Sequence, residues 1–300
     1  MSQSPANAAN LGRLGVWTWV DTMSAGEAAA FAQQVEGWGY EALWVPEAVG
    51  RDPFALLGYL AGQTGRLVFA TGIANIYARD PMTMRAVQET VGELSAGRFV
   101  LGLGVSHAPM VTGMRGHEYG KPVTSMRNYL EAMEQATYLG PRADPGTPIV
   151  IAALRENMLK LAAEKVQGAH PYNVTPEHTA RAREILGPDV TLAPEQMVLL
   201  LTDASEARRI ARQNLATYLA LPNYRNGWKW QGFADEDFEH GGSDRLIDAI
   251  VCWGDERAIA RRVQEHRDAG ADHVCIQPFR PDGEGEPDLR VLEALAPGRD

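Results

Sequence analysis

Short apolar runs of strand length alternate with stretches of helical periodicity along the chain. The apolar runs predict strands at residues 13–17, 42–45, 66–71, 99–103, 148–152, 196–201 and 273–277, with a further short one at 168–170. Between them, apolar residues recur at helical spacing, as Phe31 and Trp38 do in the predicted helix 24–38. Helix-start signals support this pattern, because Thr175 is a hydroxyl cap followed by Pro176 at the first helical position.

The strand–helix alternation predicts parallel strands joined by crossover helices. Eight such units within 300 residues favour a TIM (β/α)8 barrel, and an open doubly wound sheet is the alternative. No linker divides the chain, so residues 11–296 are predicted to form a single domain. Residues 1–10 are small and polar, and they are predicted to be a disordered N-terminal tail.

One segment, residues 220–242, interrupts the alternation before the last strand. It is long, without clear periodicity, and rich in aromatic side chains. Long loops inside compact domains often carry function, so the segment is predicted to be an irregular insertion that forms a lid, with Trp228 facing the substrate. A short helix packed on the outside of the barrel is the other interpretation.

The composition of the chain limits the kinds of binding partner and the cellular compartment that are expected. The net charge is −10 without any basic run, which argues against nucleic acid as a partner. The chain has two cysteines and no signal peptide in its first residues, so a reducing cytoplasm is expected. No apolar run is long enough to span a bilayer, no membrane association is predicted, and the histidines and acids lack metal-ligand spacing. Hydrolase and nucleotide-kinase motifs are missing from the sequence.

In a barrel of this kind, functional side chains lie where the strands end at the C-terminal face. This rule selects candidates before any motif is considered. The selected positions are Trp17, Thr18 and Trp19; Pro46, Glu47 and Ala48; residues 72–79, 104–109, 153–155 and 170–172; Thr202 and Asp203; and Gln277, Pro278 and Phe279.

At these strand ends the sequence resembles the luciferase-like monooxygenase superfamily, and most closely its members that use the deazaflavin coenzyme F420. The matching stretches are LGVWTW, YEALWVPEA, ATGIANIYARDP, GRFVLGLGVSHAP, AAEKVQGAHPYNVTPEHTARAREILG and AGADHVCIQ. Their order and spacing carry the resemblance, which covers residues 11–296. It implies a TIM barrel with F420, or alternatively FMN, at the C-terminal face, and a homodimer formed through the helices after the second and third strands.

The resemblance also implies which residues hold the cofactor. In the family, the third strand ends in a bulge with a non-prolyl cis peptide against the cofactor ring, and this peptide maps to Gly72–Ile73. Asn75 offers an amide at the rim, and the turn with Gly104 and Ser106 lets backbone approach a flat ring. The loop after the fifth strand holds the cofactor phosphate, and here it carries Leu154 and Arg155 where some relatives have two glycines. His170 and Tyr172 are expected to donate hydrogen bonds to phosphate or ribityl oxygens, and packing at the barrel rim is the alternative.

Two residues are candidates for proton transfer. His107 matches a position where some F420-dependent dehydrogenases carry an acid, and histidine can do this work near neutral pH. A loop histidine bonded to backbone is the alternative. Glu47 either positions substrate or forms an ion pair with Arg79 at the barrel mouth. Because Ala48 follows Glu47 where a sugar-phosphate dehydrogenase branch has its catalytic histidine, that mechanism is not carried over.

The expected function is therefore an F420-dependent oxidoreductase that moves a hydride between the coenzyme and a small organic substrate. Trp17, Trp19, Arg79 and Trp228 are expected to contact that substrate, which the sequence does not identify. An FMN-dependent luciferase-like monooxygenase is one alternative, and a cofactor-binding protein without turnover is another.

Overall fold

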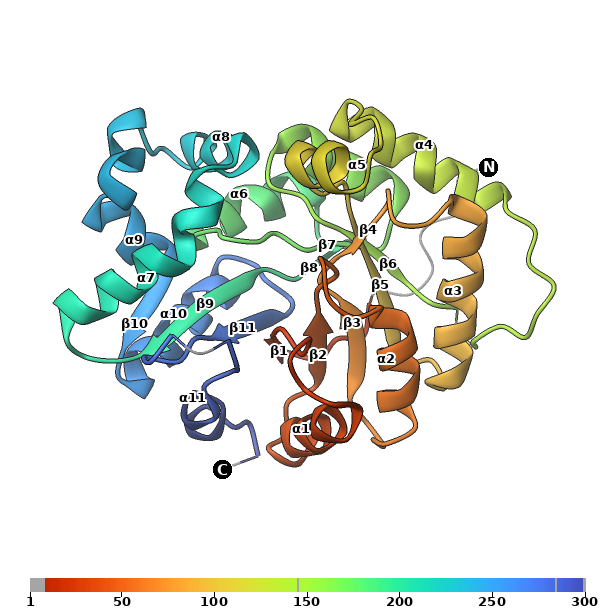
Figure 1. Cartoon of the computed structure of the whole chain (residues 1–300), viewed down its shortest axis with the longest axis horizontal. Coiled ribbons are helices and arrows are strands. Elements are labelled where there is room, and N and C mark those ends of the chain that lie inside the picture. Colours follow the sequence, from red (N-terminus) through yellow and green to blue (C-terminus); the bar gives the residue numbers. More distant parts are fainter. Residues whose placement is uncertain (1–8, 145, 284, 299–300) are drawn as a thin grey trace.

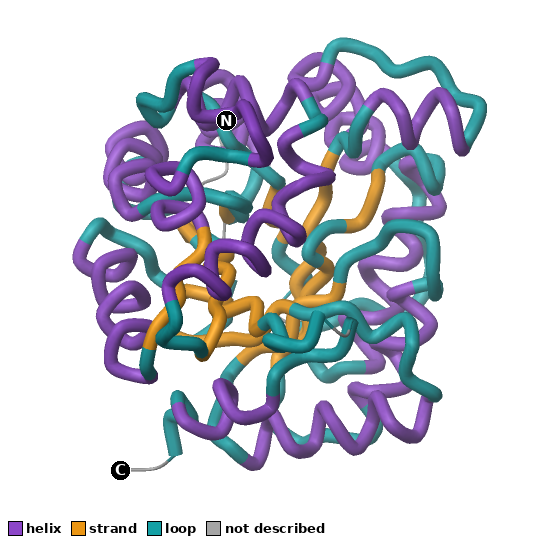
Figure 2. Tube along the Cα trace, turned by 60° about the vertical axis from the view of Figure 1, so that its left-hand side comes forward, coloured by secondary structure: helices purple, strands orange, loops and turns teal. Residues whose placement is uncertain are grey.

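The computed structural model describes residues 9–144, 146–283 and 285–298, and within them a curled parallel sheet lies inside a shell of helices (Figures 1 and 2). The strands are β1 (Leu14–Trp17), β2 (Ala42–Val45), β3 (Val68–Thr71), β4 (Ala74–Asn75), β5 (Phe99–Gly104), β6 (Ile149–Ile151), β7 (Gly168–Ala169), β8 (Thr191–Leu192), β9 (Glu195–Leu200), β10 (Val251–Gly254) and β11 (Val274–Pro278).

The helices cover the outer face of this sheet. They are α1 (Ala25–Gly37), α2 (Pro53–Ala61), α3 (Pro81–Leu94), α4 (Pro122–Gln135), α5 (Glu156–Lys165), α6 (Pro176–Leu186), α7 (Ala204–Leu219), α8 (Pro222–Trp230), α9 (Asp244–Ile250), α10 (Glu256–Asp268) and α11 (Leu289–Ala294), with the π-helix η1 (Pro109–Met114) and the 3-10 helix η2 (Asp235–Gly241). The predicted start at Thr175 is confirmed at α6, where the Thr175 hydroxyl accepts from the His178 N–H and Pro176 follows. Asp52 and Asp80 cap α2 and α3 in the same way, each followed by proline. None of these helices is long and apolar enough to cross a membrane.

The sheet closes into a barrel through the segment that joins β8 to β9. The strands are ordered β10-β9-β11-β1-β2-β3-β5-β6-β7-β8. At the β8–β9 junction, the Ala193 N–H donates to Ala169 O on one side (2.9 Å), and Pro194 O accepts from the Cys275 N–H on the other (3.1 Å). The junction therefore bridges β7 and β11, and the predicted TIM-type barrel is confirmed.

The insertion before the last strand is not irregular, which corrects the sequence-based description. Its residues form α8 and η2, and the chain continues through α9 into β10, a strand that the sequence did not predict. β10 pairs in parallel with β9 on the side opposite β11. In Figure 1 the helices α7, α8 and α9 gather beside β10. The aromatic residues of this segment fill a second apolar core around Trp228 and Phe238.

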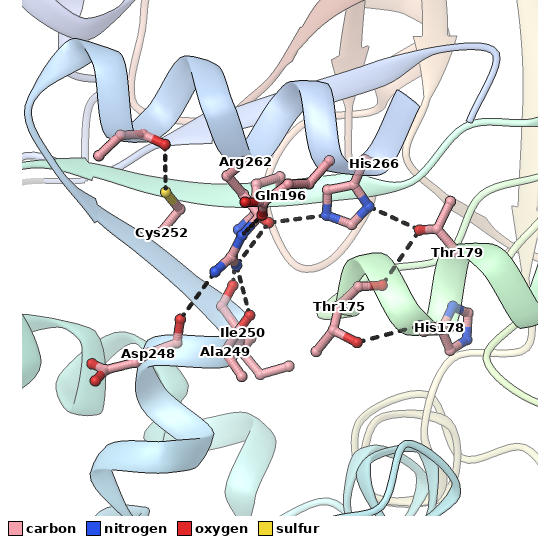
Figure 3. A network of polar contacts seen from close by, with 12 residues as sticks. Thr175, His178, Thr179, Gln196, Asp248, Ala249, Ile250, Cys252, Arg262 and His266 are labelled. Carbon is pink, nitrogen blue, oxygen red and sulfur yellow. Dashed lines mark hydrogen bonds and ion pairs between the residues drawn. The ribbon is translucent and has the colours of Figure 1, made fainter. Parts of the chain in front are cut away.

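A buried polar network ties β10 to the barrel (Figure 3). Gln196 on β9 donates to Ile250 O (2.9 Å) and its Oε1 lies 3.0 Å from His266 Nε2 on α10. The other ring nitrogen of His266 bonds with the Thr179 hydroxyl (2.8 Å) on α6. Arg262 donates to Ala249 O just before β10 (2.8 Å). Burial lowers the pKa of His266 to about 3, so this histidine is a neutral structural group.

The N-terminal tail predicted at residues 1–10 lies mostly outside the described residues. Ala9 is described, and it is buried with its amide 3.2 Å from the Thr191 hydroxyl. This residue therefore packs on the barrel at the start of β8 and does not belong to a tail.

Candidate active site

Two adjoining cavities open at the C-terminal ends of the strands. The smaller, of about 350 Å³, lies between the ends of β5 and β6 and the first turn of α5, and we call it the Arg155 cavity. The larger, of about 480 Å³, lies against the ends of β1 and β11 and against α7, and we call it the Gln277 cavity. They share a wall made by Ile73, Ser106, His107, Ala152, His170, Tyr172 and Tyr224.

The bulge after β3 builds part of this shared wall. The peptide bond between Gly72 and Ile73 is cis, the geometry that the resemblance implied at this position. The Trp17 indole N–H donates to Gly72 O (2.9 Å), and the Thr71 hydroxyl bonds to Gly102 O (2.8 Å) in place of the interrupted ladder. Ile73 consequently lies between the two cavities.

The glycines of β5 leave room for the bulge, and Gly104 also lines the Arg155 cavity, so its expected approach to the cofactor ring stays a prediction. A Cβ at Gly104 would lie 2.3 Å from Ile73 Cδ1, and one at Gly102 would lie 1.9 Å from Thr71 O. These glycines are needed because the bulge packs directly on β5.

His107 is half-buried in the shared wall, on the turn after β5 that also carries Ser106 with positive φ (54°). Its ring lies 5.4 Å from the ring of Tyr224 and has no hydrogen bond to any described residue. Burial lowers the pKa of the imidazole below its usual value, so the ring is neutral at neutral pH. A neutral, unbonded imidazole facing both cavities is able to accept a proton from a bound molecule.

His170 is held more tightly than the sequence suggested. Its Nδ1 lies 2.7 Å from Ala193 O, and its ring stacks on Trp44 at 4.3 Å. A carbonyl requires Nδ1 to carry the proton, so Nε2 keeps only a lone pair, and this buried atom has no partner in the described residues. Burial lowers the pKa of His170 to about 4. The expected donation to a phosphate is therefore corrected, because the free nitrogen is an acceptor.

The Arg155 cavity carries the features of an anion site. Arg155 precedes α5, is exposed, and makes no ion pair with any described acid, while Glu156 pairs with Lys160 at 2.6 Å. No side chain caps α5, so the amides of Glu156 and Asn157 have no partner among the described residues, whereas the Met158 amide donates to Arg155 O (3.0 Å). Unbonded amides and a guanidinium at one helix start attract a negatively charged group.

Tyr172, Tyr218 and Gln277 form a hydrogen-bonded row along the Gln277 cavity. The Tyr172 hydroxyl donates to Gln277 Oε1 (2.8 Å), and the Tyr218 hydroxyl lies 2.8 Å from that of Tyr172. Behind them, burial raises the pKa of Glu195 to about 8. The strand-end rule selected Gln277, but Tyr218 and Tyr224 were missed because they lie on helices beyond β9, where no strand-end signal points to them.

A model of the luciferase-like monooxygenase family matches residues 9–273. The chain belongs to this family. A Mycobacterium tuberculosis protein whose name refers to a coenzyme F420-dependent oxidoreductase is 30% identical over 123 residues, which are 41% of this chain and only 35% of that relative's length.

Solved structures of luciferase-like proteins share the fold. The F420-dependent tetrahydromethanopterin reductase from Methanopyrus kandleri aligns with a TM-score of 0.72 and 18% identity over 95% of this chain and 97% of its own. The oxygenating constituent of 3,6-diketocamphane monooxygenase from Pseudomonas putida, in complex with FMN, aligns with a TM-score of 0.71 and 16% identity. The alignment covers 96% of this chain and 97% of that protein's chain.

Glu47 and Arg79 form the ion pair that the sequence analysis gave as an alternative. The Arg79 guanidinium donates to Glu47 Oε1 (2.6 Å) and also bonds Asp52, and it lines neither cavity. The other Glu47 oxygen accepts from the Asn75 N–H (2.8 Å). The Asn75 side chain accepts from the Tyr77 amide, so Asn75 braces the bulge and does not reach a cavity. The expected contacts of Arg79 with substrate and of Asn75 with cofactor are thus corrected.

Residues 220–242 form part of the wall of the Arg155 cavity. The expected Trp228 does not contribute to this wall. Trp228 is fully buried, and its indole donates to Asn173 O (3.1 Å). Tyr224 and Trp230, on the two flanks of α8, line the Arg155 cavity instead. Trp228 therefore anchors α8 and is not a substrate contact.

Trp17 and Trp19 both line the Gln277 cavity, and their rings meet edge to face at 5.5 Å. Leu154 lines the Arg155 cavity next to Arg155. Across the described residues, His, Cys, Asp and Glu side chains nowhere gather in a group of three that could hold a metal ion.

Proposed function

We propose that this luciferase-like protein is an F420-dependent oxidoreductase that moves a hydride between the deazaflavin and a small organic substrate. The proposal rests on the pair of cavities, one with the features of an anion site and one lined with aromatic side chains, which meet at Ile73 and His107. The F420-dependent relatives support the choice of cofactor. A bound deazaflavin supplies the hydride, and the protein supplies orientation, electrostatics and water exclusion.

The residues present fit such a cofactor. Arg155 and the free amides of α5 would hold its phosphate. The orphaned Nε2 of His170 would accept a hydrogen bond from a ribityl hydroxyl or a ring N–H. Ile73, in the shared wall, would support the flat ring.

The protein's own chemistry centres on His107. The neutral imidazole accepts the proton of a substrate hydroxyl when an alcohol is oxidised, and it returns the proton to the oxygen in the reverse direction. Trp17, Trp19 and Tyr218 form an apolar surround that excludes water from this step.

An FMN-dependent monooxygenase is the second candidate, because the FMN complex of the Pseudomonas putida protein has a fold as similar as that of the F420-dependent reductase. Titrating the protein with each cofactor and following cofactor fluorescence separates the two. We expect saturable F420 binding that is tighter than FMN binding. Tight FMN binding without F420 binding would contradict the proposal, and steady turnover with either cofactor would exclude a binding protein without activity.

A homodimer through α2 and α3 is part of the proposal. Tyr59 on α2 and Met82 and Leu94 on α3 are large apolar side chains that are exposed on these neighbouring helices. Burying such side chains against a second copy would remove apolar surface from water. Light scattering is expected to give twice the 32.7 kDa chain mass, and a monomeric mass would refute this arrangement.

A further inference from the structure

The Gln277 cavity is lined largely by aromatic side chains, and its described lining has no lysine or arginine. Its lining includes Trp17, Trp19, Tyr218 and Phe279. The two acids of the wall are Glu47, which is paired with Arg79, and Glu286, whose carboxylate lies 3.6 Å from the Arg280 guanidinium. An anion entering this cavity would lose its hydration without gaining a counter-charge.

The hydrogen bonds of Tyr172 fix which end of the Gln277 amide is free. A tyrosine hydroxyl has one hydrogen, and that of Tyr172 is donated to Gln277 Oε1. The 2.8 Å contact between the hydroxyls of Tyr172 and Tyr218 therefore requires Tyr218 to donate. With Oε1 occupied, the Gln277 Nε2 remains a donor, and it has no hydrogen-bond partner in the described part of the chain. Gln277 itself is 3% exposed and lines the cavity.

Two other polar side chains of this wall already have hydrogen-bond partners. The Thr18 hydroxyl donates to Trp19 O (3.3 Å), and the Asn214 amide donates to Ile210 O (3.0 Å). The hydrogen bonds from Tyr218 to Tyr172 and from Tyr172 to Gln277 thus leave the Gln277 Nε2 as a donor toward a ligand in the Gln277 cavity. The complementary ligand is uncharged, has a flat or cyclic apolar body, and carries an oxygen that accepts a hydrogen bond.

We propose that the substrate is an uncharged aromatic or alicyclic carbonyl compound, or its secondary alcohol, whose oxygen is bound by the Gln277 amide. The assignment rests on the proposed function and names its substrate class. Trp17 and Trp19 hold the ring, and Gln277 sets which face of the carbonyl is presented to the shared wall. Gln277 is a positioning and specificity-determining residue, and His107 handles the proton.

The proposed reaction needs a two-electron reductant, which is the reduced deazaflavin. In the reducing direction, the carbonyl carbon gains a hydride from a reduced deazaflavin, which loses two electrons. The C=O π bond breaks as the C–H bond forms, and the oxygen takes one proton through His107. The products are the secondary alcohol and the oxidised deazaflavin.

The test compares three probes in ligand-observed NMR titrations of the whole protein without cofactor. Acetophenone carries the carbonyl, α-methylstyrene replaces its oxygen by a methylene group of similar shape, and 4-acetylbenzoate adds a negative charge. Because a neutral hydrogen bond has a modest net value, acetophenone is expected to bind about threefold to tenfold more tightly than α-methylstyrene. The benzoate is expected to bind at least about tenfold more weakly, since its charge has no partner.

Variants assign the preference to Gln277. Gln277→Leu removes the donor and is expected to bind acetophenone and α-methylstyrene equally, while a misfolded variant would bind neither. Tyr172→Phe frees the amide to rotate and is expected to reduce the preference, and Gln277→Asn is expected to restore part of it relative to Gln277→Leu. Gln264→Leu, on the outer face of α10, is the matched control with unchanged preference.

An unchanged preference in Gln277→Leu, or equal binding of the benzoate, would overturn the assignment. A parallel F420 titration separates this from the proposed function. Intact ketone preference without F420 binding would contradict the proposed function and support the cavity assignment, whereas F420 binding without ketone preference would contradict the assignment alone.

Discussion

The two cavities share a wall but offer opposite chemistry. The Arg155 cavity has an unpaired guanidinium and the open start of α5, whereas the Gln277 cavity has aromatic rings, one directed amide and no cation among its described lining. The difference in lining follows from the secondary-structure elements that border each cavity. A helix start provides amides and partial positive charge, while the ends of β1 and β11 and the side of α7 provide side chains alone.

Under the proposed function, this one barrel face would bind two unlike molecules. An anion would be held at the helix start, where backbone N–H groups lack partners. An apolar molecule would be held at the strand ends, where the backbone groups are already hydrogen-bonded within the barrel. His107 and Ile73, in the shared wall, are then the contacts available to both ligands. Arg155→Ala and Trp17→Phe are each expected to change one side of this division, and His107→Ala changes the wall between them.

The largest expected effect is on His107. His107→Ala should lower turnover of 1-phenylethanol with oxidised F420 by about a hundredfold, because the proton acceptor is lost. In the wild type, the rate of alcohol oxidation should rise as the pH passes through the lowered pKa of His107, because the neutral ring is the active form. At neutral pH the rate should no longer change with pH. Ketone reduction should fall over the same pH range, because it needs the protonated ring.

Steady-state rates between pH 4.5 and 8 check both directions, and His107→Ala should abolish this pH-dependent limb. His117→Ala is the control, because His117 is exposed on the loop after η1 and lines neither cavity. A variant at His107 with wild-type rates and pH profile would remove His107 from the reaction.

Arg155→Ala should affect the anion side only. We expect about a tenfold loss of affinity for the cofactor, because one charge-assisted contact to phosphate is removed. Riboflavin, which lacks the phosphate, should bind the variant and the wild type equally, and so should acetophenone. Fluorescence titrations measure this, with Arg142→Ala as a surface control, and an equal loss for riboflavin and FMN would place the phosphate elsewhere.

Trp17→Phe should produce the smallest effect, on the wall of the Gln277 cavity. Phenylalanine keeps the ring but leaves Gly72 O without the indole donor, which should lower the free energy of unfolding by about 1–3 kcal/mol. Urea unfolding measures the loss. Trp253→Phe is the comparison, because its indole bonds the half-exposed Asp248 and should cost less. An unchanged unfolding free energy in Trp17→Phe would show that the bulge does not depend on this bond.

Local signals in the sequence predicted most of the barrel and the positions of the strand ends. Caps such as Asp80 and Thr175, and uniformly apolar strands such as β2, depend on nearby residues and were therefore predictable. β10 was missed because its four residues follow α9 directly and are held by parallel pairing with β9, which is distant in sequence.

Side-chain direction was the main limit for the site. Arg79, Asn75 and Trp228 were expected to face the site, but they are turned to Glu47, the Tyr77 amide and Asn173 O. The sequence analysis offered the first partner only as an alternative, and the third, 55 residues away, is supplied by the fold. The same holds for His170, where the carbonyl of Ala193 decides which nitrogen remains free. Residue type predicted that these groups were polar and near the mouth, and packing decided what each one bonds.

The most direct test of the division between the cavities is whether both are occupied at once. The dissociation constant of acetophenone is measured by NMR titration with and without saturating F420. The account predicts that the ketone binds as tightly or more tightly when F420 is present, because the two occupy different cavities and meet at the shared wall. Competition, seen as a ketone dissociation constant that rises in proportion to F420 concentration, would contradict it.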